Sequence, residues 1–471
     1  MAKVLIGVVK VKALALLVGP AGVGLLGAFQ SLVGTTSTLV GLGVNKSGVR
    51  QLAAARGDET MPGLVSTVLV GFNIAAGLVG AAILLVLREE AAIWTFGDAD
   101  RAGPVGWLGA AVLLTLLAGS QMAVLQGRRR IQALATTRIL SSVLGTAAGV
   151  LAVFLLGEQG IVPVVIAAPA ATVLVATYFN WSQSGWMSHG SFSEARDQLQ
   201  SMLWLGVPFM GAGLLTTGTQ LYSRVLVIDE LGLDAGGHFQ AAWAISRTYL
   251  GVVLAAMAAD YYPRLAQAMP DRAQAVRLVD EQSEVALLVG GPILIGMMGF
   301  APLLISLLYS SDFAASVEVL RWQVFGDMLK LLGWPLGFIV IAQGRGALFL
   351  GTQAAWNGVY AGLLTMGISS IGLVVTGYAF VAAYLVVFSL NLMLGWRLLS
   401  YFPRPRIIVH AAGLVVVSVA LLAAAPFGGW IAYGAATFCT LLVSVLSGAR
   451  LYAVGWRPRR KKKKKVQQDE A

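Results

Sequence analysis

The segment from Gln323 to Trp334 carries the side chains whose types and spacing are best suited to binding a ligand. Four of them follow the spacing i, i+4, i+7 and i+11, which places them on one face of a helix: Gln323, Asp327, Lys330 and Trp334. Asp327 and Lys330 can pair with each other, and Trp334 offers a flat surface for a sugar ring or another side chain. Two interpretations are open. The stripe lines a substrate cavity, which we favour, or its two charges only neutralise each other where helices meet.

Further polar side chains lie about one hundred residues earlier, in two adjoining apolar segments. Gln220 and Arg224 are one helical turn apart. Gln240 and Arg247 are two turns apart, and Arg247 lies about midway along its segment, too deep to reach the surface easily. An ionisable group inside a membrane span costs at least about 2.5 kcal/mol unless a partner or a water-filled cavity receives it. We therefore expect a cationic cavity, although Arg224 can instead extend toward the acidic residues that follow it. Such a cavity favours an anionic ligand, above all phosphate.

Metal and redox chemistry are not expected. The single cysteine, Cys439, cannot form an internal disulfide, and the three histidines are far apart: His189, His238 and His410. Of the 471 residues, 57% are hydrophobic and 12% are charged, against about 25% charged in a soluble domain. The mean hydropathy is +0.78. These values predict an all-α integral membrane protein with no metal, no cofactor and no catalytic residue.

A membrane-spanning helix needs about 20 apolar residues, and Gly, Pro and charge clusters divide the chain into about fourteen such segments. We expect them near 4–19, 23–45, 61–87, 104–127, 131–156, 161–181, 201–228, 235–259, 284–309, 317–343, 346–375, 378–400, 407–426 and 429–449. The charge-free stretch 359–396 is divided at its only turn residues, Thr376, Gly377 and Tyr378. The first segment is short and contains Lys10 and Lys12. Either these lysines reach the cytoplasmic surface, or the true start lies upstream.

The distribution of basic residues predicts the orientation in the membrane. If the amino terminus is cytoplasmic, most of the 33 Lys and Arg residues fall on the cytoplasmic side, whereas the opposite loops hold only Arg88 and Arg101 among many acidic residues. Both termini are therefore predicted to be cytoplasmic. Much of the net charge of +11 lies in the tail. Its lysines, from Lys461 to Lys465, are expected to bind the anionic inner leaflet rather than nucleic acid.

An offset of 214 residues relates the two halves of the chain. It matches Ala21 with Ala235 and Arg50 with Arg264. The same offset relates the predicted spans of the first half to those of the second half. Because six spans separate the copies, both halves enter the membrane in the same direction. The predicted organisation is a six-helix lobe, a cytoplasmic linker, a second parallel six-helix lobe, two additional spans and a basic tail, at 1–181, 182–200, 201–400, 401–449 and 450–471. Two such lobes are typical of alternating-access carriers, here with rocking about the linker.

Three segments resemble the polysaccharide flippases, of the O-antigen and enterobacterial-common-antigen type, in the multidrug/oligosaccharidyl-lipid/polysaccharide exporter superfamily: 19–25 with Phe29, 262–265 and 322–330. The resemblance implies a MATE-like fold. It also implies movement of an undecaprenyl-pyrophosphate-linked glycan from the cytoplasmic to the periplasmic leaflet of the bacterial inner membrane. Carried over residue by residue, it assigns the cavity to Arg224, Gln240, Gln323, Asp327 and Lys330. Arg247 departs from the family pattern, which has an acidic residue there. The two C-terminal spans instead resemble the fourteen-span flippases of peptidoglycan precursors.

Two other functions compete with a flippase. A drug or cation antiporter of the same superfamily needs a deep free carboxylate, but Asp327 has Lys330 three residues away. A polymerase or glycosyltransferase needs an acid, a base or a metal site near a large loop, and the segment 182–200 offers few ionisable groups. We therefore predict a non-enzymatic flippase for a lipid-linked oligosaccharide. It is expected to be a monomer and to work beside the polymerase and chain-length proteins of its pathway.

Overall fold

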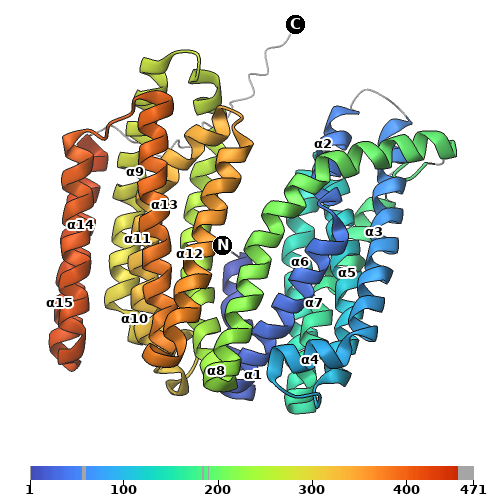
Figure 1. Ribbon diagram of the computed structural model, residues 1–471, viewed down its shortest axis with the longest axis horizontal. Coiled ribbons are helices and arrows are strands. Elements are labelled where there is room, and N and C mark those ends of the chain that lie inside the picture. Colours follow the sequence, from blue (N-terminus) through green and yellow to red (C-terminus); the bar gives the residue numbers. More distant parts are fainter. Residues whose placement is uncertain (1, 56–59, 183–184, 189, 454–471) are drawn as a thin grey trace, which may run out of the picture.

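The structure is a computed structural model that describes the chain except residues 1, 56–59, 183–184, 189 and 454–471. The described residues form helices and no strand (Figure 1). The first half contains α1 (Ala2–Gly41), α2 (Val44–Ala54), α3 (Met61–Val86), α4 (Arg88–Phe96), α5 (Ala102–Gly127), α6 (Ile131–Leu156) and α7 (Ile161–Trp181). The second half contains α8 (Phe192–Ala268), α9 (Arg272–Gly299), α10 (Ala301–Leu308), α11 (Ser316–Ala342), α12 (Gly346–Ile371), α13 (Val375–Leu399), α14 (Pro405–Ala424) and α15 (Gly429–Ala453).

Two of these helices are bent at a glycine. The backbone leaves the helical region at Gly19 in α1 (φ 60°) and at Gly232 in α8 (φ 86°). A residue with a Cβ rarely adopts such a positive φ. Glycine therefore permits the bend at both sites. Ten helical stretches of the described chain are long and apolar enough to cross a membrane, and α8 alone has 77 residues. The protein is a multi-pass membrane protein, and the count of fourteen spans stays a prediction.

The order of the helices repeats along the chain. The bends at Gly19 and Gly232 are separated by nearly the predicted offset of 214 residues. The series α3, α4, α5, α6 and α7 is followed by a series of similar lengths, α9, α10, α11, α12 and α13. In each series the second member is a short helix, α4 or α10, of 9 or 8 residues. This agreement supports the duplication, and the lobe boundaries themselves remain a proposal.

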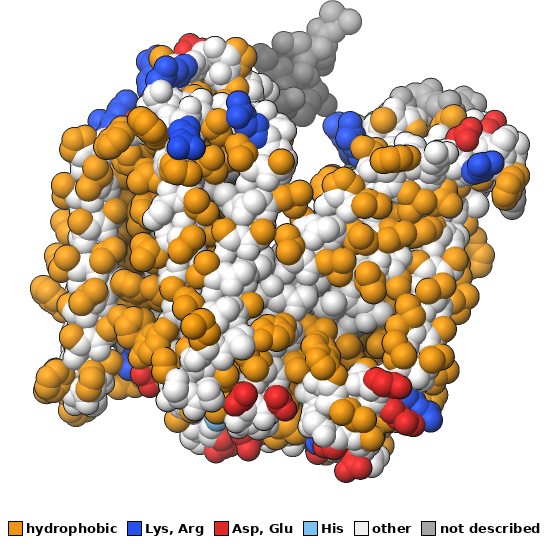
Figure 2. Space-filling model, in the orientation of Figure 1, with side chains coloured by type: hydrophobic (Ala, Val, Ile, Leu, Met, Phe, Trp, Pro, Cys, Tyr) orange, Lys and Arg blue, Asp and Glu red, His pale blue; other side chains and the backbone are white. Residues whose placement is uncertain are grey.

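The two halves separate at one end of the molecule and meet at the other. Helices α2 to α7 form one group and α9 to α15 the other, with α1 and α8 between them (Figure 1). Figure 2 shows a hollow at the end where Lys and Arg side chains gather, whereas Asp and Glu side chains gather at the closed end. We call these the basic end and the acidic end. The basic end is the one that the charge distribution predicts to face the cytoplasm.

Helices α1 and α8 pack backbone against backbone where the halves meet, and we call this contact the seam. A Cβ at Gly24 would collide with the carbonyl oxygen of Leu233. A Cβ at Gly237 would collide with the carbonyl oxygen of Pro20. Because both helices carry glycine at these points, the seam closes tightly beside the two bends.

The ammonium group of Lys12 lies close to the end of α10. Its Nζ donates hydrogen bonds to the carbonyl oxygens of Ser306, at 2.9 Å, and Tyr309. The expectation that Lys12 reaches the cytoplasmic surface is therefore wrong. The lysine satisfies carbonyl groups that the helix end leaves without partners, and its positive charge suits that end of the helix dipole.

The described part of the linker is bound to the first half. Ser188 accepts a hydrogen bond from the Thr67 hydroxyl at 2.9 Å, and Arg128 donates to the carbonyl oxygens of Gly185 and Trp186 at 3.0 and 3.1 Å. The rest of the predicted linker is helical, since α8 begins at Phe192. The described residues of the linker are therefore held against the first half in this structure. Rocking of the lobes about the linker stays a prediction.

Two other boundaries differ from the sequence-based ones. Helix α12 ends at Ile371 and the chain turns at Gly372 (φ 76°), whereas Thr376 and Gly377 lie inside α13. Gly377 serves packing, because a Cβ there would collide with Trp322. The predicted span at 284–309 combines most of α9 with the separate helix α10. The short helices α2, α4 and α10 were not predicted, since each is too short to cross the membrane.

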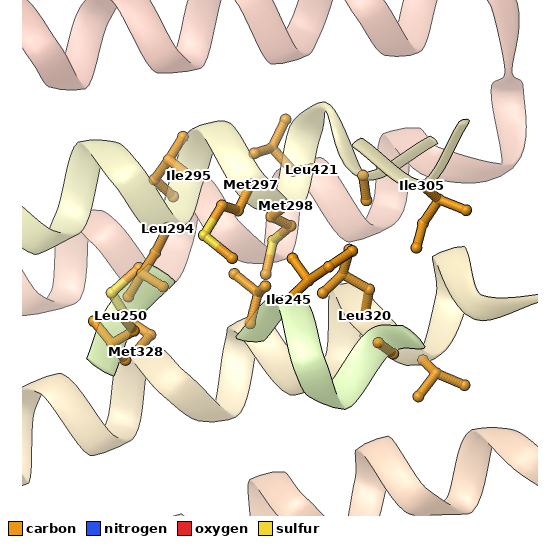
Figure 3. Packing of buried hydrophobic residues seen from close by; sticks show 14 of the residues in the cluster. Ile245, Leu250, Leu294, Ile295, Met297, Met298, Ile305, Leu320, Met328 and Leu421 are labelled. Carbon is orange, nitrogen blue, oxygen red and sulfur yellow. The ribbon is translucent and has the colours of Figure 1, made fainter. Parts of the chain in front are cut away.

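The two C-terminal helices, α14 and α15, are attached to α9. Their side chains join the largest apolar cluster, in which Leu421 lies near Met298 (Figure 3). Two ion pairs reinforce this packing at the basic end. Arg404 lies 2.7 Å from Asp280, and Arg450 lies 2.9 Å from Glu284. The extra helices therefore pack directly on the second half.

Candidate functional site

The candidate site consists of two cavities that adjoin at Arg247. The larger, of about 490 Å³, lies among α8, α11, α12 and α13, and we call it the aromatic cavity. The smaller, of about 280 Å³, lies between α1 and α8, and we call it the seam cavity. Gln220, Trp243 and Arg247 line both cavities. A ligand with two chemically different parts could therefore occupy both at once.

Arg224 lies in the wall of the seam cavity and is 6% exposed. Its Nε and Nη2 donate to Oε1 of Gln240 at 3.0 and 2.6 Å, and its Nη1 donates to the carbonyl oxygen of Gln220 at 3.3 Å. Within the described chain no carboxylate pairs with it. A buried charge held only by neutral dipoles is costly, so an anion in this cavity would be favourable.

Gln240 is fixed by contacts on both sides of the seam. Its side chain accepts the two bonds from Arg224 and lies against Gly27 of α1. Gln30 lines the same cavity from α1. The sequence pairs Phe29-Gln30 and Phe239-Gln240 therefore place one amide on each wall of the seam cavity.

Arg247 is the most available of the cations. Its side chain is exposed and lines both cavities. It has no ion pair or hydrogen bond among the residues that the structure describes. The guanidinium can therefore receive a ligand without breaking an existing contact.

Lys330 lines the aromatic cavity, and its ammonium group contacts Asp327 and Tyr384. Its Nζ lies 3.6 Å from Oδ1 of Asp327 and 5.6 Å from the centre of the Tyr384 ring. Asp327 is fully buried and accepts a hydrogen bond from the Ser246 hydroxyl at 2.5 Å. Because Asp327 lies behind the wall, it positions Lys330 and Ser246, and both of these face the cavity.

The six predicted residues divide into two groups. Arg224 and Gln240 line the seam cavity, Lys330 lines the aromatic cavity, and Arg247 lines both. Gln323 and Asp327 are fully buried and belong to neither wall. Both amide atoms of Gln323 lack a hydrogen-bond partner in the described structure. That these six residues bind a substrate stays a prediction.

Aromatic and amide side chains make up most of the larger cavity. They come from all four helices: Gln220, Trp243, Trp334, Phe338, Phe349, Gln353, Trp356, Asn357, Phe380, Tyr384, Phe388 and Asn391. Trp334 was predicted from its spacing, but the residues on α12 and α13 were not. A signal was present, since Phe380, Tyr384 and Asn391 follow the spacing i, i+4 and i+11. The absence of charge in this stretch made it resemble a lipid-facing helix.

The two cavities together are suited to an anion joined to sugars. Three cations line them, and none of the described lining residues is Asp or Glu. Arginine and lysine bind phosphate oxygens well. Aromatic rings offer flat apolar faces, and amides can both donate and accept hydrogen bonds to hydroxyl groups.

Sequence comparison agrees with this chemistry. A family described as "Polysaccharide biosynthesis protein" matches residues 13–318. The chain belongs to this family. It is 22% identical over 402 residues to the Lipid III flippase of Escherichia coli (strain K12), which covers 82% of this chain and 93% of that protein. The Lipid III flippase of Shigella flexneri matches to the same extent.

Solved structures share the fold at low sequence identity. The Lipid II flippase MurJ in an inward closed conformation has a TM-score of 0.65 at 12% identity, covering 92% of this chain and 98% of its own. An inward-facing multidrug resistance MATE transporter also has a TM-score of 0.65, at 17% identity, covering 84% of this chain and 94% of its own. A transporter from Pyrococcus furiosus with a binding pocket of reversed polarity has a TM-score of 0.59 at 17% identity, with coverage of 85% and 92%. The predicted MATE-like, all-α fold is confirmed.

Proposed function

We propose that the protein is a lipid-linked oligosaccharide flippase. It moves an undecaprenyl-pyrophosphate-linked glycan from the cytoplasmic to the periplasmic leaflet for surface polysaccharide biosynthesis, such as that of O-antigen, common antigen or exopolysaccharide. The observation that carries this proposal is the pair of adjoining cavities lined by three cations and no described carboxylate. The similarity to two proteins named Lipid III flippase supports it.

Each part of the substrate has a corresponding surface. The pyrophosphate binds beside Arg224, Arg247 and Lys330, where its charge compensates guanidinium and ammonium groups. The glycan packs on Trp334 and Trp356 in the aromatic cavity. The polyprenyl tail stays in the lipid, because it is already out of water there and entering the cavities would bring no hydrophobic gain. The headgroup alone therefore crosses through the protein.

The shape of the molecule supports alternating access. The hollow at the basic end admits the headgroup from the cytoplasmic leaflet (Figure 2). Closure of that end and opening of the seam then release it to the other leaflet. In this orientation both termini are cytoplasmic and the protein lies in the bacterial inner membrane. The lysines from Lys461 to Lys465, which lie outside the described residues, would contact the anionic inner leaflet. The expected monomeric state and pathway partners belong to the same proposal.

A drug or cation antiporter is the alternative, because MATE transporters share the fold. Such a carrier needs a carboxylate that can exchange a cation for a proton or sodium ion. Asp327 already faces Lys330 and Ser246, and it lies behind the cavity wall. This arrangement favours the flippase.

Native mass spectrometry of the protein, gently extracted from its own membranes, tests the proposal. We expect a bound polyprenyl-pyrophosphate oligosaccharide on the wild type and its loss in Arg247→Ala and Lys330→Ala. Arg264→Ala is the matched control, because Arg264 lies on the same helix as Arg247 but lines neither cavity and pairs with Asp260 at 3.0 Å. Only bulk phospholipid, together with binding of cationic dyes, would favour the antiporter instead.

A further inference from the structure

A third cavity lies apart from the site described above, at the acidic end of the first half. It has a volume of about 780 Å³, within the range of roughly 300 to 1,000 Å³ that is usual for ligand pockets. It lies between the beginnings of α5 and α7, and we call it the outer groove. Apolar side chains form its walls: Trp107, Leu156, Val162 and Ile166. Leu25 and Phe29 of α1 also line it and are themselves buried.

The mouth of the outer groove carries charges of both signs. Arg101 and Glu158 line it, and their side chains lie 3.6 Å apart. A second acid, Asp98, lies 3.7 Å from Arg101. Both distances exceed the roughly 2.7 to 2.9 Å of a charge-assisted hydrogen bond, so these ion pairs are loose. The guanidinium and the carboxylates can therefore exchange these contacts for a ligand that offers both charges.

We propose that the outer groove binds one phospholipid with a zwitterionic head group that contains a primary ammonium, of the phosphatidylethanolamine type. Its phosphate binds Arg101, its ammonium binds Glu158 and Asp98, and an acyl chain lies along Trp107 and Val162. In the proposed orientation this lipid belongs to the periplasmic leaflet.

The charge pattern selects this head group over two others. An anionic phospholipid would satisfy Arg101 but would leave Glu158 and Asp98 facing added negative charge. A choline head group carries the same charges as ethanolamine, but its methylated nitrogen cannot donate a hydrogen bond to a carboxylate. The exposed ring of Trp107 suits the boundary between head groups and acyl chains.

An occupant of the outer groove would also touch the helix that forms the seam. Leu25 and Phe29 line the groove and belong to the same apolar cluster as Leu221 and Val225 of α8. A bound acyl chain therefore adds apolar contacts to the part of α1 that packs against α8. We expect the lipid to stabilise the form of the protein in which this packing is intact.

The test compares lipid retention by the full-length protein in nanodiscs that contain equal parts of phosphatidylethanolamine, phosphatidylcholine and phosphatidylglycerol. The protein is then released for native mass spectrometry. We expect the wild type to retain one phosphatidylethanolamine at least about fivefold more often than either other lipid, an effect on the order of 1 kcal/mol. Glu158→Gln should abolish the preference over phosphatidylcholine. Val162→Trp should abolish retention of all three lipids, because the larger ring fills the groove.

Glu89→Gln is the matched control, since Glu89 is an exposed acid at the same end that does not line the groove. It should retain lipid as the wild type does. Equal retention of the three lipids by the wild type would overturn the proposal, and so would an unchanged preference in Glu158→Gln. Glu158 is on the surface, so its variant keeps the test decisive even if Val162→Trp fails to fold.

Discussion

The two halves of the molecule share a series of helices but differ in what they bury. Among the described residues of α1 to α7, the buried polar side chains are all uncharged, such as Asn73, Gln121 and Asn180. In α8 to α15 the buried polar side chains include Arg224, Asp280 and Asp327. Two similar series of helices therefore tolerate very different polar contents, because helix packing is set by small and apolar side chains.

The difference indicates a division of labour between the halves. The second half supplies every cation that lines the two cavities, whereas the first half contributes Gln30, Ser31 and Gly34 to the seam cavity. The cations of the proposed site thus lie on one side. The other side provides a polar but uncharged wall, which in the proposed mechanism moves past the bound anion without breaking ion pairs.

The largest effect is expected from breaking the buried pair in the second half. Lys330→Met leaves the carboxylate of Asp327 buried without its cation and should lower the free energy of unfolding by about 3 kcal/mol. Asn180→Leu in the first half removes a hydrogen bond of 2.6 Å to Gln121 and should cost only about 1 to 2 kcal/mol. Chemical denaturation of both variants in the same detergent measures the difference. Equal losses would remove the contrast between the halves.

A double variant separates this stability effect from substrate binding. Adding Asp327→Asn to Lys330→Met removes the uncompensated charge, so the double variant should be more stable than Lys330→Met alone. It should still bind the substrate poorly, because the cavity has lost a cation. Recovery of both properties would show that Lys330 serves packing rather than the ligand.

The next largest effect is expected at Arg247. Replacing it by Ala should reduce substrate binding by about 2 to 3 kcal/mol, which is a factor of roughly 30 to 150. Gln30→Ala, on the opposite wall of the seam cavity, should reduce it much less because no charge is lost. Titration of the purified proteins with a short-chain polyprenyl-pyrophosphate glycan compares them. Similar losses in both variants would contradict the assignment of charge recognition to the second half.

A smaller effect is expected at the seam between the halves. Gly237→Ala places a methyl group against the carbonyl oxygen of Pro20 and should destabilise the closed acidic end by about 1 to 3 kcal/mol. Gly251→Ala is a control on the same helix, where a Cβ meets no neighbouring atom. Distances between spin labels across the acidic end should lengthen only in the first variant. Unchanged distances would mean that the seam does not hold the molecule in its present shape.

The smallest effect is expected at the helices that only the second half possesses. Arg450→Gln removes the ion pair between α15 and Glu284, whose side chain is 14% exposed. Because Arg450 itself is partly exposed, we expect a loss of only about 0.5 to 1 kcal/mol. Thermal unfolding should shift slightly while substrate binding stays at the wild-type level. A large loss of binding would show that α15 takes part in the site.

Helical periodicity on α11 predicted two of the cavity-lining residues correctly and two others wrongly. The spacing on α11 correctly brought Lys330 and Trp334 to one cavity. Gln323 and Asp327 lie on the same stripe, but they are covered, because neighbouring helices pack over that part of α11. A periodic pattern identifies a face of a helix, and only the tertiary packing decides whether that face meets a cavity or another helix.

Charged residues within the apolar segments indicated the cavity reliably. A lack of charged residues did not indicate that a segment faces lipid. The positions of Arg224 and Arg247 pointed to a cavity in a membrane span, and the structure places both on cavity walls. The aromatic wall on α12 and α13 was missed, because apolar side chains suit lipid and cavity equally. The turn predicted at Thr376 and Gly377 from their residue types is wrong, because both residues lie inside α13.

Transport in proteoliposomes tests the central claim most directly. The full-length protein is reconstituted with a short-chain polyprenyl-pyrophosphate glycan, and the glycan that becomes accessible to an external glycosidase is measured over time. The account predicts flipping by the wild type and by Arg264→Ala, and at least about thirtyfold slower flipping by Arg247→Ala. Flipping by Arg247→Ala at the wild-type rate would contradict the account, as would transport of cationic dyes without any movement of the glycan lipid.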